Sequence, residues 1–392
     1  MKFLHTSDLH IGLRLKNYDL YEEQKDVLNQ MINAVKKYKP DAFIIAGDIY
    51  DKSIPSSDAV HLFDEFITGL KNALPQMAIM MISGNHDSRQ RTGCYGRILS
   101  NQKIYVSTDL TEDGGEISDN QMEQSENIHF TKIELDDEFG KVNFYLVPFI
   151  KPAYVRHILL EDGLSYEEAF KKMILRENID YSDRNVLVSH QFFINRKNNE
   201  EVERMSSEIV TVGNIDAISS ETIMRFDYAA LGHIHKPMKA GAEHLRYCGT
   251  PFPYSIDEAG QEKGILLVTM NGKNDDIIIE EIPLVPLHNV RKISGKLEDV
   301  LKEKSSDFVS ITITDDEDLD TVDMQVKLKA NYERLCEIRR SASKIREYEK
   351  FDLTDLEDEL EPFDMFSAFY KDMSDDEKEI VQEVINEVTG RA

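Results

Sequence analysis

The stretch Leu231-Gly232-His233-Ile234-His235 sets two histidines around a single apolar residue, at the end of the apolar run Tyr228–Leu231. A short apolar run of this kind predicts a buried strand, so the histidine pair lies where a strand gives way to a loop. On a strand, residues two apart point to the same side. The spacing therefore predicts that both imidazoles face one common cleft.

Four further polar clusters follow short apolar runs in the same way. In chain order they are Asp8-Leu9-His10, Gly47-Asp48-Ile49-Tyr50-Asp51, Gly84-Asn85-His86-Asp87 and Ser189-His190. The runs before them predict strands at Lys2–Thr6, Ala42–Ala46, Met77–Ile82 and Asn185–Ser189. A sheet can bring strand ends from distant parts of a chain into one crevice. We therefore expect all five clusters to meet.

Amphipathic stretches separate these runs, and the alternation predicts an α/β layered fold. Helices are expected at Tyr18–Lys39, Ser57–Leu74 and Ser165–Glu177, and a further strand at Phe144–Phe149. The polar, acidic stretch Thr111–Glu126 predicts a mobile loop.

A chain of 392 residues suits two or three domains. The runs Gly264–Met270 and Ile277–Leu284 predict a hairpin across Asn271-Gly272, which closes a first domain, residues 1–285. Residues 286–341 are expected to form a small unit with helices at Leu297–Glu303 and Thr321–Lys329 and strands at Phe308–Thr314 and Tyr332–Arg339. Residues 342–392 are interpreted as an acidic linker and a terminal helical segment.

Composition and charge restrict the function classes. The three cysteines lie far apart without a CxxC pair, which favours reduced thiols in an intracellular protein. Neither a secretory signal nor an apolar run of ~18 residues is visible, so we expect a cytoplasmic location. The net charge of −27 argues against autonomous DNA binding, because phosphate neutralisation needs a basic surface. Any DNA contact must be local, metal-assisted or shared with another subunit.

The clusters combine carboxylates with imidazoles, a ligand set that suits Mn²⁺, Fe²⁺ or Zn²⁺ better than Ca²⁺ or Mg²⁺. Asp48 has two oxygens with which to bridge two ions, and Asn85 can ligate through its amide oxygen without adding charge. Asp8 and Asp48 cancel only half of the charge of two divalent ions, so the set favours an anionic substrate together with a hydroxide nucleophile. Together the clusters predict a binuclear centre for cleavage of phosphoesters.

For several residues near the clusters, the sequence allows two alternative roles. His86 follows Asn85 and is a candidate to stabilise or protonate the leaving oxygen, with Asp51 placed to orient it. For Asp51 and for Asp87, a helix N-cap role and a catalytic role are both left open. The candidates for contacts with backbone phosphates are Arg89, Arg91 and Arg97, for which a solvated surface position is the alternative. The histidines interpreted as structural are His5, His129, His157, His244 and His288.

These clusters, with Phe226–Pro237, Ser189-His190-Gln191-Phe192 and Gly249-Thr250-Pro251, resemble the calcineurin-like metallophosphoesterase superfamily and, within it, the double-strand-break repair nucleases. The resemblance is close over about residues 1–290 and looser beyond. It implies a four-layer sandwich of two mixed β-sheets flanked by helices, a small α+β capping domain that helps to position DNA, and a helical C-terminal tail. Tyr50 and Met238 depart from the family pattern but are not proposed ligands.

The resemblance also implies a role for each cluster residue. One metal is assigned to Asp8, His10, Asp48 and His235, and the other to Asp48, Asn85, His190 and His233. His86 matches the catalytic histidine that is not a ligand, with Asp51 as its orienting partner. Two divalent ions are implied, Mn²⁺ first, with Mg²⁺, Fe²⁺ and Zn²⁺ left open.

The activity that the resemblance implies is cleavage of DNA in repair, replication and recombination, as an exonuclease on duplex ends and an endonuclease on single strands or hairpins. It further implies a nucleoid-associated complex, in which a homodimer formed through the nuclease domain joins an SMC-like ABC-type ATPase. A phosphatase or small-nucleotide phosphodiesterase, and a scaffold whose metals only stabilise the fold, are the alternatives.

The tail supports a partner independently of the resemblance. Apolar residues recur there at three- and four-residue spacing on an otherwise acidic helix: Phe366, Phe369, Tyr370, Met373, Val381, Val384, Ile385 and Val388. We interpret this stripe as a docking helix for the ATPase. Packing of the helix back onto its own core is the alternative.

Overall fold

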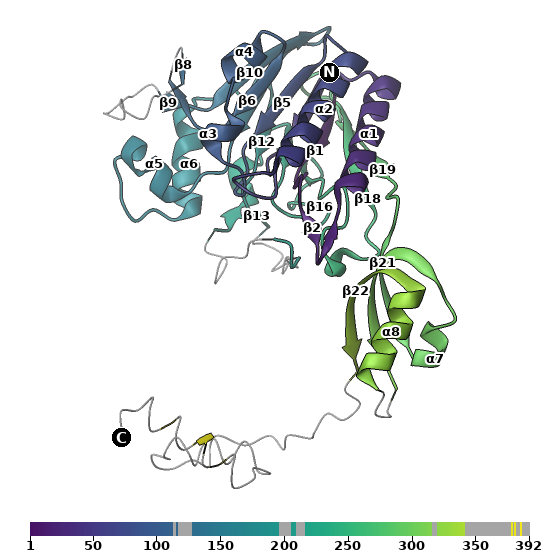
Figure 1. Cartoon of the computed structure of the whole chain (residues 1–392). Coiled ribbons are helices and arrows are strands. Elements are labelled where there is room, and N and C mark those ends of the chain that lie inside the picture. The colour runs from purple at the N-terminus through teal and green to yellow at the C-terminus, as the bar shows by residue number, and fades with distance from the viewer. Residues whose placement is uncertain are drawn as a thin grey trace. The chain divides into compact units, whose positions relative to one another are not determined.

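The computed structural model describes residues 1–112, 115–116, 128–195, 205–208, 216–315 and 320–341, together with residues 378, 380, 381 and 385. Two six-stranded mixed sheets dominate it (Figure 1). The first has the order β19 (Ile278–Leu284), β18 (Lys263–Thr269), β1 (Lys2–Thr6), β4 (Ala42–Ile45), β5 (Ala78–Ile82) and β6 (Ile104–Ser107). The second has the order β10 (Thr131–Asp137), β11 (Gly140–Val147), β12 (Arg184–Ser189), β15 (Tyr228–Leu231), β17 (Leu245–Tyr247) and β16 (Met238–Lys239).

The period of two along each strand divides the apolar side chains between two cores. In β1, Phe3 packs into the core between the two sheets, whereas Leu4 belongs to the core on the outer face of the first sheet. Phe144 of β11 meets Phe3 across the inner core, with ring centroids 5.7 Å apart. The central strand β1 therefore packs on both faces, as the uninterrupted apolar run in the sequence predicts.

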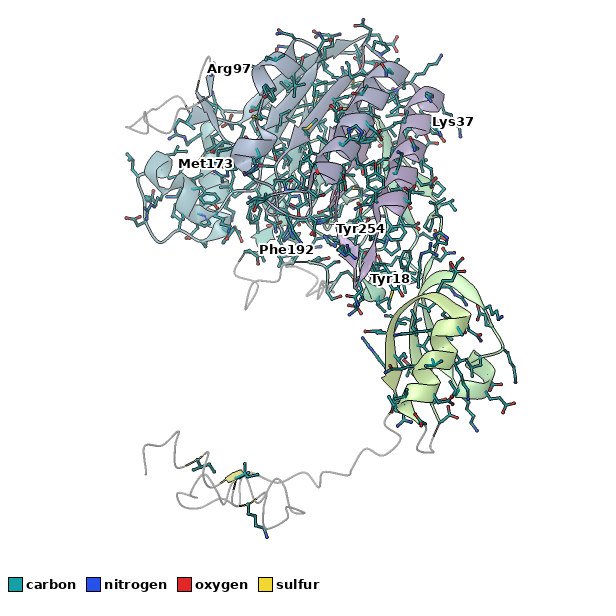
Figure 2. The ribbon with its side chains drawn as sticks, in the orientation of Figure 1. Tyr18, Lys37, Arg97, Met173, Phe192 and Tyr254 are labelled. Atoms are coloured by element: carbon teal, nitrogen blue, oxygen red, sulfur yellow. The ribbon has the colours of Figure 1, made fainter. Side chains whose placement is uncertain are left out.

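Helices cover the two outer faces. α1 (Tyr21–Tyr38) and α2 (Ser57–Ala73) pack on the first sheet, and α6 (Tyr166–Arg176) packs on the second beside α5 (Pro152–Leu159). Lys37 of α1 is exposed and Met173 of α6 is buried, which illustrates the two faces of such helices (Figure 2). The predicted four-layer sandwich is thus confirmed.

Helix starts follow local capping rules. Ser56 caps α2 by accepting a hydrogen bond from the Ala59 amide, and Ser165 forms a capping box with Glu168 at α6. The predicted first helix began too early, because Tyr18 belongs to a short strand, β3.

The short elements complete the larger domain. They are β2 (Arg14–Leu15), β3 (Tyr18–Asp19), β7 (Thr111–Glu112), β8 (Gly115–Glu116), β9 (Ile128–His129), β13 (Phe193–Ile194), β14 (Ile218–Ser219), the helices α3 (Arg89–Thr92) and α4 (Gly96–Ser100), and the 3₁₀ turns η3 (Ser220–Ile223) and η4 (Ile256–Glu258). The predicted loop Thr111–Glu126 holds β7 and β8, and its other residues lie outside the described ones.

A three-stranded parallel sheet forms the smaller part, in the order β20 (Val290–Gly295), β21 (Ser305–Ile313) and β22 (Tyr332–Arg340), with α7 (Leu297–Val300) and α8 (Thr321–Asn331) between the strands. Strand β20 was not predicted from the sequence. This strand lies at an edge of the sheet, and its Arg291 and Lys292 interrupt the apolar pattern.

Residues Met1–Ser341 form one compact unit and Ala342–Ala392 a second. Within the first unit, Phe308 of β21 shares a core with Phe252 and Leu20. Most of the predicted docking stripe lies outside the described residues; Val381 and Ile385 are described and helical. Among the described residues, no helix has the length and hydropathy that a membrane crossing requires.

Candidate metal centre

All five polar clusters lie in loops that leave the carboxyl ends of parallel strands. The loops continue the strand pairing for a few residues: the Asp8 amide donates to the Gly47 carbonyl over 3.0 Å, and the His10 amide to the Asp48 carbonyl over 3.0 Å. The Gly232 amide donates to the Ser189 carbonyl over 3.0 Å in the second sheet. Loops from both sheets therefore meet at one edge, where α/β proteins place their ligands.

The backbone at these positions differs from what the spacing argument assumed. Four of the proposed ligands have positive φ angles: Asp8 at 51°, His10 at 41°, Asp48 at 48° and His233 at 96°. They are not strand residues, so the alternation of strand side chains does not explain why the pairs converge. Left-handed turns in the loops aim the side chains instead, at a conformational cost of about 1–3 kcal/mol each.

Two glycines permit the close crossing of these loops. A Cβ on Gly232 would lie 2.0 Å from the Ala46 carbonyl oxygen, and one on Gly84 would lie 2.1 Å from Asp48 Oδ1. Both distances are far below van der Waals contact. Glycine is needed here for close approach, and the loops could not meet with any other residue at these positions.

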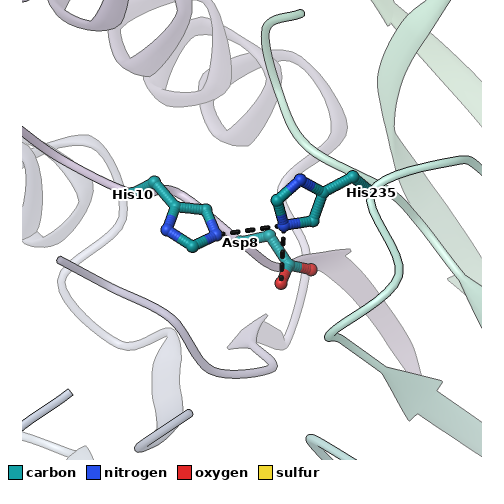
Figure 3. Close-up of side chains that lie close together, drawn as sticks. All are labelled: Asp8, His10 and His235. Carbon is teal, nitrogen blue, oxygen red and sulfur yellow. Dashed lines mark hydrogen bonds and ion pairs between the residues drawn. The ribbon is translucent and has the colours of Figure 1, made fainter. Parts of the chain in front are cut away.

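One group of donors consists of Asp8, His10 and His235 (Figure 3). His10 Nε2 lies 3.1 Å from His235 Nε2, and His235 Nε2 lies 4.0 Å from Asp8 Oδ1. Asp48 Oδ2 is 3.6 Å from His10 Nε2. These four are the residues that the family pattern assigns to one metal.

A second group lies on the other side of Asp48. His190 Nε2 is 3.3 Å from Asp48 Oδ2 and 3.1 Å from Asn85 Oδ1. Asn85 Oδ1 is also 2.9 Å from His233 Nδ1. The structure thus brings all seven predicted ligands together, with Asp48 between the two groups, although the division of ligands between two metals stays a prediction.

The electrostatics of the cluster fit a bound cation. Burial, together with the Asp48 carboxylate, raises the pKa of Asp8 to about 7. Burial alone would also raise the pKa of Asp48, but His190 and other imidazoles hold it well below its usual range. The pKa of His190 rises to about 9, because Asp48 outweighs the effect of burial. Without metal the cluster must hold protons, and divalent ions would take their place.

The two nitrogens of His10 and His235 give a further test of fit. Burial lowers the pKa of His10 to about 3, so this imidazole is neutral in the folded protein. Two ring nitrogens that face each other at 3.1 Å need either one shared proton or one cation that accepts both lone pairs. The donor set and its burial therefore fit a pair of metal ions, and three such groups of donor atoms occur within the described residues.

His86 borders the same centre. Its amide donates to Asp48 Oδ1 over 2.9 Å, and its Nε2 lies 4.0 Å from Asp48 Oδ2. Its Nδ1 is 2.8 Å from the main-chain carbonyl oxygen of Asp51. The expected orienting contact thus comes from the Asp51 backbone, and the carboxylate is not needed for it.

Asp87 is not a helix N-cap, and a catalytic role for it stays a prediction. Its carboxylate accepts hydrogen bonds from the amides of Ile49, Tyr50 and Gly84, and burial raises its pKa to about 6. The N-cap of α3 is Ser88, not Asp87, so the N-cap alternative was wrong. Asp87 ties the loop that carries Asp48 to the loop that carries Asn85.

The three arginines occupy different surroundings. Arg89 pairs with Asp109 over 3.1 Å and stacks on the Tyr154 ring at 3.9 Å from its centroid. Arg91 and Arg97 are exposed on α3 and α4. Contact of these side chains with DNA stays a prediction.

The other histidines have partners of their own. His5 Nδ1 lies 3.0 Å from the Tyr228 hydroxyl. His129 lies 3.6 Å from Glu177, His244 Nε2 lies 3.3 Å from the Met224 carbonyl, and His288 Nδ1 lies 2.6 Å from Glu23. The side chain of His157 is outside the described residues.

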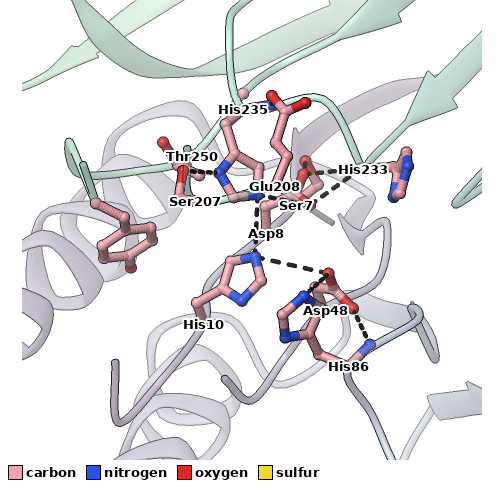
Figure 4. A network of polar contacts seen from close by, with 12 residues as sticks. Ser7, Asp8, His10, Asp48, His86, Ser207, Glu208, His233, His235 and Thr250 are labelled. Atoms are coloured by element: carbon pink, nitrogen blue, oxygen red, sulfur yellow. Dashed lines mark hydrogen bonds and ion pairs between the residues drawn. The ribbon is translucent and has the colours of Figure 1, made fainter. Parts of the chain in front are cut away.

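Sequence reasoning gave no role to a group of polar residues behind His235, namely Ser207, Glu208, Thr250, Glu258 and Lys263. Figure 4 shows the first three of them. They come from three separate segments, and no motif joins them. No sequence signal marks Glu258 or Lys263, because the near-complete burial of both charges is visible only in the structure.

Comparisons with known proteins agree with this geometry. A family model described as calcineurin-like phosphoesterase matches residues 1–237. A second, the SbcD_C model described as type 5 capsule protein repressor C-terminal domain, matches residues 285–374.

Three solved structures are similar at low identity. GAP50, the anchor in the inner membrane complex of Plasmodium, is 12% identical with a TM-score of 0.38, over 88% of this chain and 98% of that one. The protein TT1561 of Thermus thermophilus is 13% identical with a TM-score of 0.38, over 74% and 99%. A dimetal phosphatase from Danio rerio is 12% identical with a TM-score of 0.38, over 73% and 97%. The first family model matches more than half of this chain, and the chain therefore belongs to the calcineurin-like phosphoesterase family.

Proposed function

We propose that this chain is an SbcD-type nuclease subunit, which hydrolyses phosphodiester bonds of DNA at the centre described above. Membership of the phosphoesterase family supports the hydrolytic chemistry, and the SbcD_C match supports the nuclease over other members of the family. We propose double-strand exonuclease and single-strand or hairpin endonuclease activity, in repair, replication and recombination at the nucleoid.

The centre would hold two divalent ions, of which Mn²⁺ is our first choice. When bound, such a pair supplies Lewis acidity and lowers the pKa of a water nucleophile. The protein itself contributes the shape: Asp8, His10, His190, His233 and their neighbours are held in loops that hydrogen bonds already fix. Groups that are already held in place need little reorganisation energy when they bind their ligand.

His86 is the residue that we propose for proton transfer. Its side chain is 17% exposed, so it can reach both the centre and a substrate. The Asp51 carbonyl oxygen accepts a hydrogen bond from His86 Nδ1, and this bond orients the ring. In this orientation Nε2 faces the Asp48 side of the centre. There the doubly protonated ring, with Nδ1–H on the Asp51 carbonyl, can give its Nε2 proton to the leaving oxygen and become neutral.

A polar cavity of about 520 Å³ lies beside the centre, and we interpret it as part of the binding site for a polymeric substrate. Asp51, Ser207 and Tyr254 are among the residues that line it. Basic side chains from both the larger and the smaller sheet systems also line it: Arg14, Lys16, Lys52 and Arg339. Three acidic side chains line the cavity as well, namely Asp51, Asp257 and Glu337. Glu337 pairs with Lys16 over 3.5 Å and with Arg339 over 2.9 Å. The lining is therefore close to neutral on a chain with a net charge of −27, and we propose that a DNA backbone lies along it with help from the metal centre or a partner.

We further propose that residues 342–392 bind an SbcC-type ABC ATPase and that the subunit forms a homodimer within a heterotetramer. The SbcD_C match extends into this segment, to residue 374. A partner of this kind would add basic surface for DNA. It would also explain an acidic chain that acts on a polyanion.

The proposal can be tested with the purified chain and Mn²⁺. Linear duplex DNA and a hairpin are incubated with and without an SbcC-type partner and ATP, and products are resolved on sequencing gels. We expect shortening of duplex ends and opening of the hairpin. If DNA stays intact while cyclic nucleotides or aryl phosphates turn over rapidly, the chain is a phosphodiesterase for small substrates or a phosphatase instead.

A further inference from the structure

The ring of His235 contacts Ser207 (Figure 4), and Ser207 in turn contacts the buried Glu258. Ser207 Oγ lies 2.7 Å from His235 Nδ1 and donates to Glu258 Oε1 over 2.8 Å. A hydroxyl has one proton to donate. Because that proton goes to the carboxylate, the serine oxygen must accept from His235, and Nδ1 therefore carries the ring proton.

This hydrogen-bond order leaves the other ring nitrogen with its lone pair. His235 Nε2 is the atom that faces His10 Nε2 at 3.1 Å and Asp8 Oδ1 at 4.0 Å. A histidine binds a metal through such an unprotonated nitrogen, and the group bonded to the opposite nitrogen decides which one is free. The contacts of Ser207 thus select the tautomer that can act as a ligand.

The backbone of His235 is also fixed on both sides. Its amide donates to Glu208 Oε1 over 2.9 Å. Its carbonyl oxygen accepts from the Lys263 ammonium over 2.9 Å and from the Thr250 amide over 3.1 Å. Position and tautomer are therefore set by separate contacts. Among the described residues, the hydrogen-bond partner of the ring Nδ1 is Ser207, and Glu258 Oε1 lies 3.9 Å from the same nitrogen.

Glu258 is a rigid end for this chain of hydrogen bonds. It is fully buried and pairs with Lys263 over 2.7 Å. Thr250 Oγ1 and Ser255 Oγ also donate to its oxygens, over 2.9 Å and 3.1 Å. A buried ion pair adds little net stability, because the loss of hydration offsets the attraction. We therefore interpret the Glu258–Lys263 pair as a contact that fixes the position of the carboxylate.

We propose that Ser207 is a positioning residue for the metal site of Asp8, His10 and His235, through the Glu258–Ser207–His235 hydrogen-bond chain. The inference rests on the proposed metal-dependent function and adds a residue to it. Ser207 lines the cavity beside the centre, so it also joins the ligand to the surface on which a substrate would lie.

Metal binding tests this directly. Mn²⁺ is titrated into the full-length protein by calorimetry for the wild type, Ser207→Ala, Ser207→Thr and Ser255→Ala. We expect Ser207→Ala to weaken one of two sites by about 10- to 100-fold, and Ser207→Thr, which keeps the hydroxyl, to restore most of the affinity. Ser255→Ala is the matched control. It removes another donor to the same carboxylate without touching His235, and its affinities should stay within about threefold of wild type.

The tautomer gives a second readout that a loss of packing would not produce. Two-bond ¹H–¹⁵N correlations in the metal-free protein should show His235 protonated at Nδ1 in the wild type and a mixture of tautomers in Ser207→Ala. Equal Mn²⁺ affinities for the wild type and Ser207→Ala, equal losses for Ser207→Ala and Ser255→Ala, or an Nε2-protonated wild type would each overturn the proposal.

These measurements use no substrate, so they separate the two proposals. A wild type that binds two Mn²⁺ ions and loses one site in Ser207→Ala, yet leaves DNA intact, would refute the nuclease and support the positioning role. A wild type that binds no Mn²⁺ would overturn both.

Discussion

Removal of the Asp87 carboxylate should loosen the metal centre without touching a ligand. Its Oδ2 accepts from the Ile49 amide over 3.1 Å and from the Gly84 amide over 2.9 Å, and its Oδ1 accepts from the Tyr50 amide over 3.0 Å. The first two donors belong to different loops. Asp87→Ala therefore leaves three amides without this acceptor and unties the Asp48 loop from the Asn85 loop.

The magnitude follows from the three bonds. A buried donor that loses its partner costs about 1–3 kcal/mol. Asp87 is half-buried, so water can reach part of the space, and loss of its repulsion with Asp48 offsets another part. We therefore take the lower end of the range and expect Asp87→Ala to reduce the free energy of unfolding by about 3 kcal/mol. Asp87→Asn can keep the two bonds of Oδ2 and should lose only about 1 kcal/mol.

Urea unfolding at neutral pH, followed by circular dichroism, measures both losses, and calorimetry measures Mn²⁺ affinity. Asp109→Ala is the control, because it removes an exposed carboxylate that pairs with Arg89 over 3.1 Å. It should change the free energy of unfolding by less than about 1 kcal/mol. The reasoning is refuted if Asp87→Ala resembles Asp109→Ala, or if Asp87→Asn is as unstable as Asp87→Ala.

Three other perturbations should have distinct results. Gly232→Ala sets a methyl group 2.0 Å from the Ala46 carbonyl oxygen, so we expect a loss of about 3 kcal/mol or more, and a melting temperature near that of the wild type would contradict this. Burial alone would raise the pKa of Asp137, but hydrogen bonds from Arg184 hold it well below its usual value. The stabilisation by this pair is therefore present above the unfolded pKa near ~4 and is lost as pH falls toward the lowered folded pKa. Urea unfolding of the wild type should thus weaken below pH ~4, and an Asp137→Asn variant with the same acid profile would refute the attribution. His86→Gln should slow DNA cleavage by about 100-fold or more while elemental analysis still finds two Mn²⁺ ions, and loss of metal would instead make His86 a ligand.

The sequence was informative about the strands because burial on both faces leaves an uninterrupted apolar run. Tyr228–Leu231 and Lys2–Thr6 were predicted to the residue for this reason. The edge strand Val290–Gly295 was missed, since one side of an edge strand carries charged residues and the run disappears. Sequence patterns thus report burial. The exposed edge strand β19 was found because a turn signal, Asn271-Gly272, joined its apolar residues to a buried partner strand.

The ligands were predictable as residue types but not as geometry. Asp, His and Asn after apolar runs indicate a metal centre, yet the pairing rule borrowed from strands does not apply to residues with φ of 51° and 41°, as at Asp8 and His10. Ser207 and Glu258 could not be found at all. Each is an ordinary polar residue in its own segment, and only the fold brings them to His235.

The left-handed ligands imply that the centre is built before any metal arrives. Such backbone angles cost about 1–3 kcal/mol each, and a metal-free loop would relax unless other contacts opposed it. Here the opposing contacts form without metal. They are the hydrogen bonds to the Asp87 carboxylate, the close approach of the loops at Gly232, and the Glu258–Ser207–His235 hydrogen bonds. Weakening any one of them should therefore lower metal affinity through the geometry of the ligands, although none of the three residues binds a metal. Affinity at this centre would then be a property of the loops as much as of the ligand atoms.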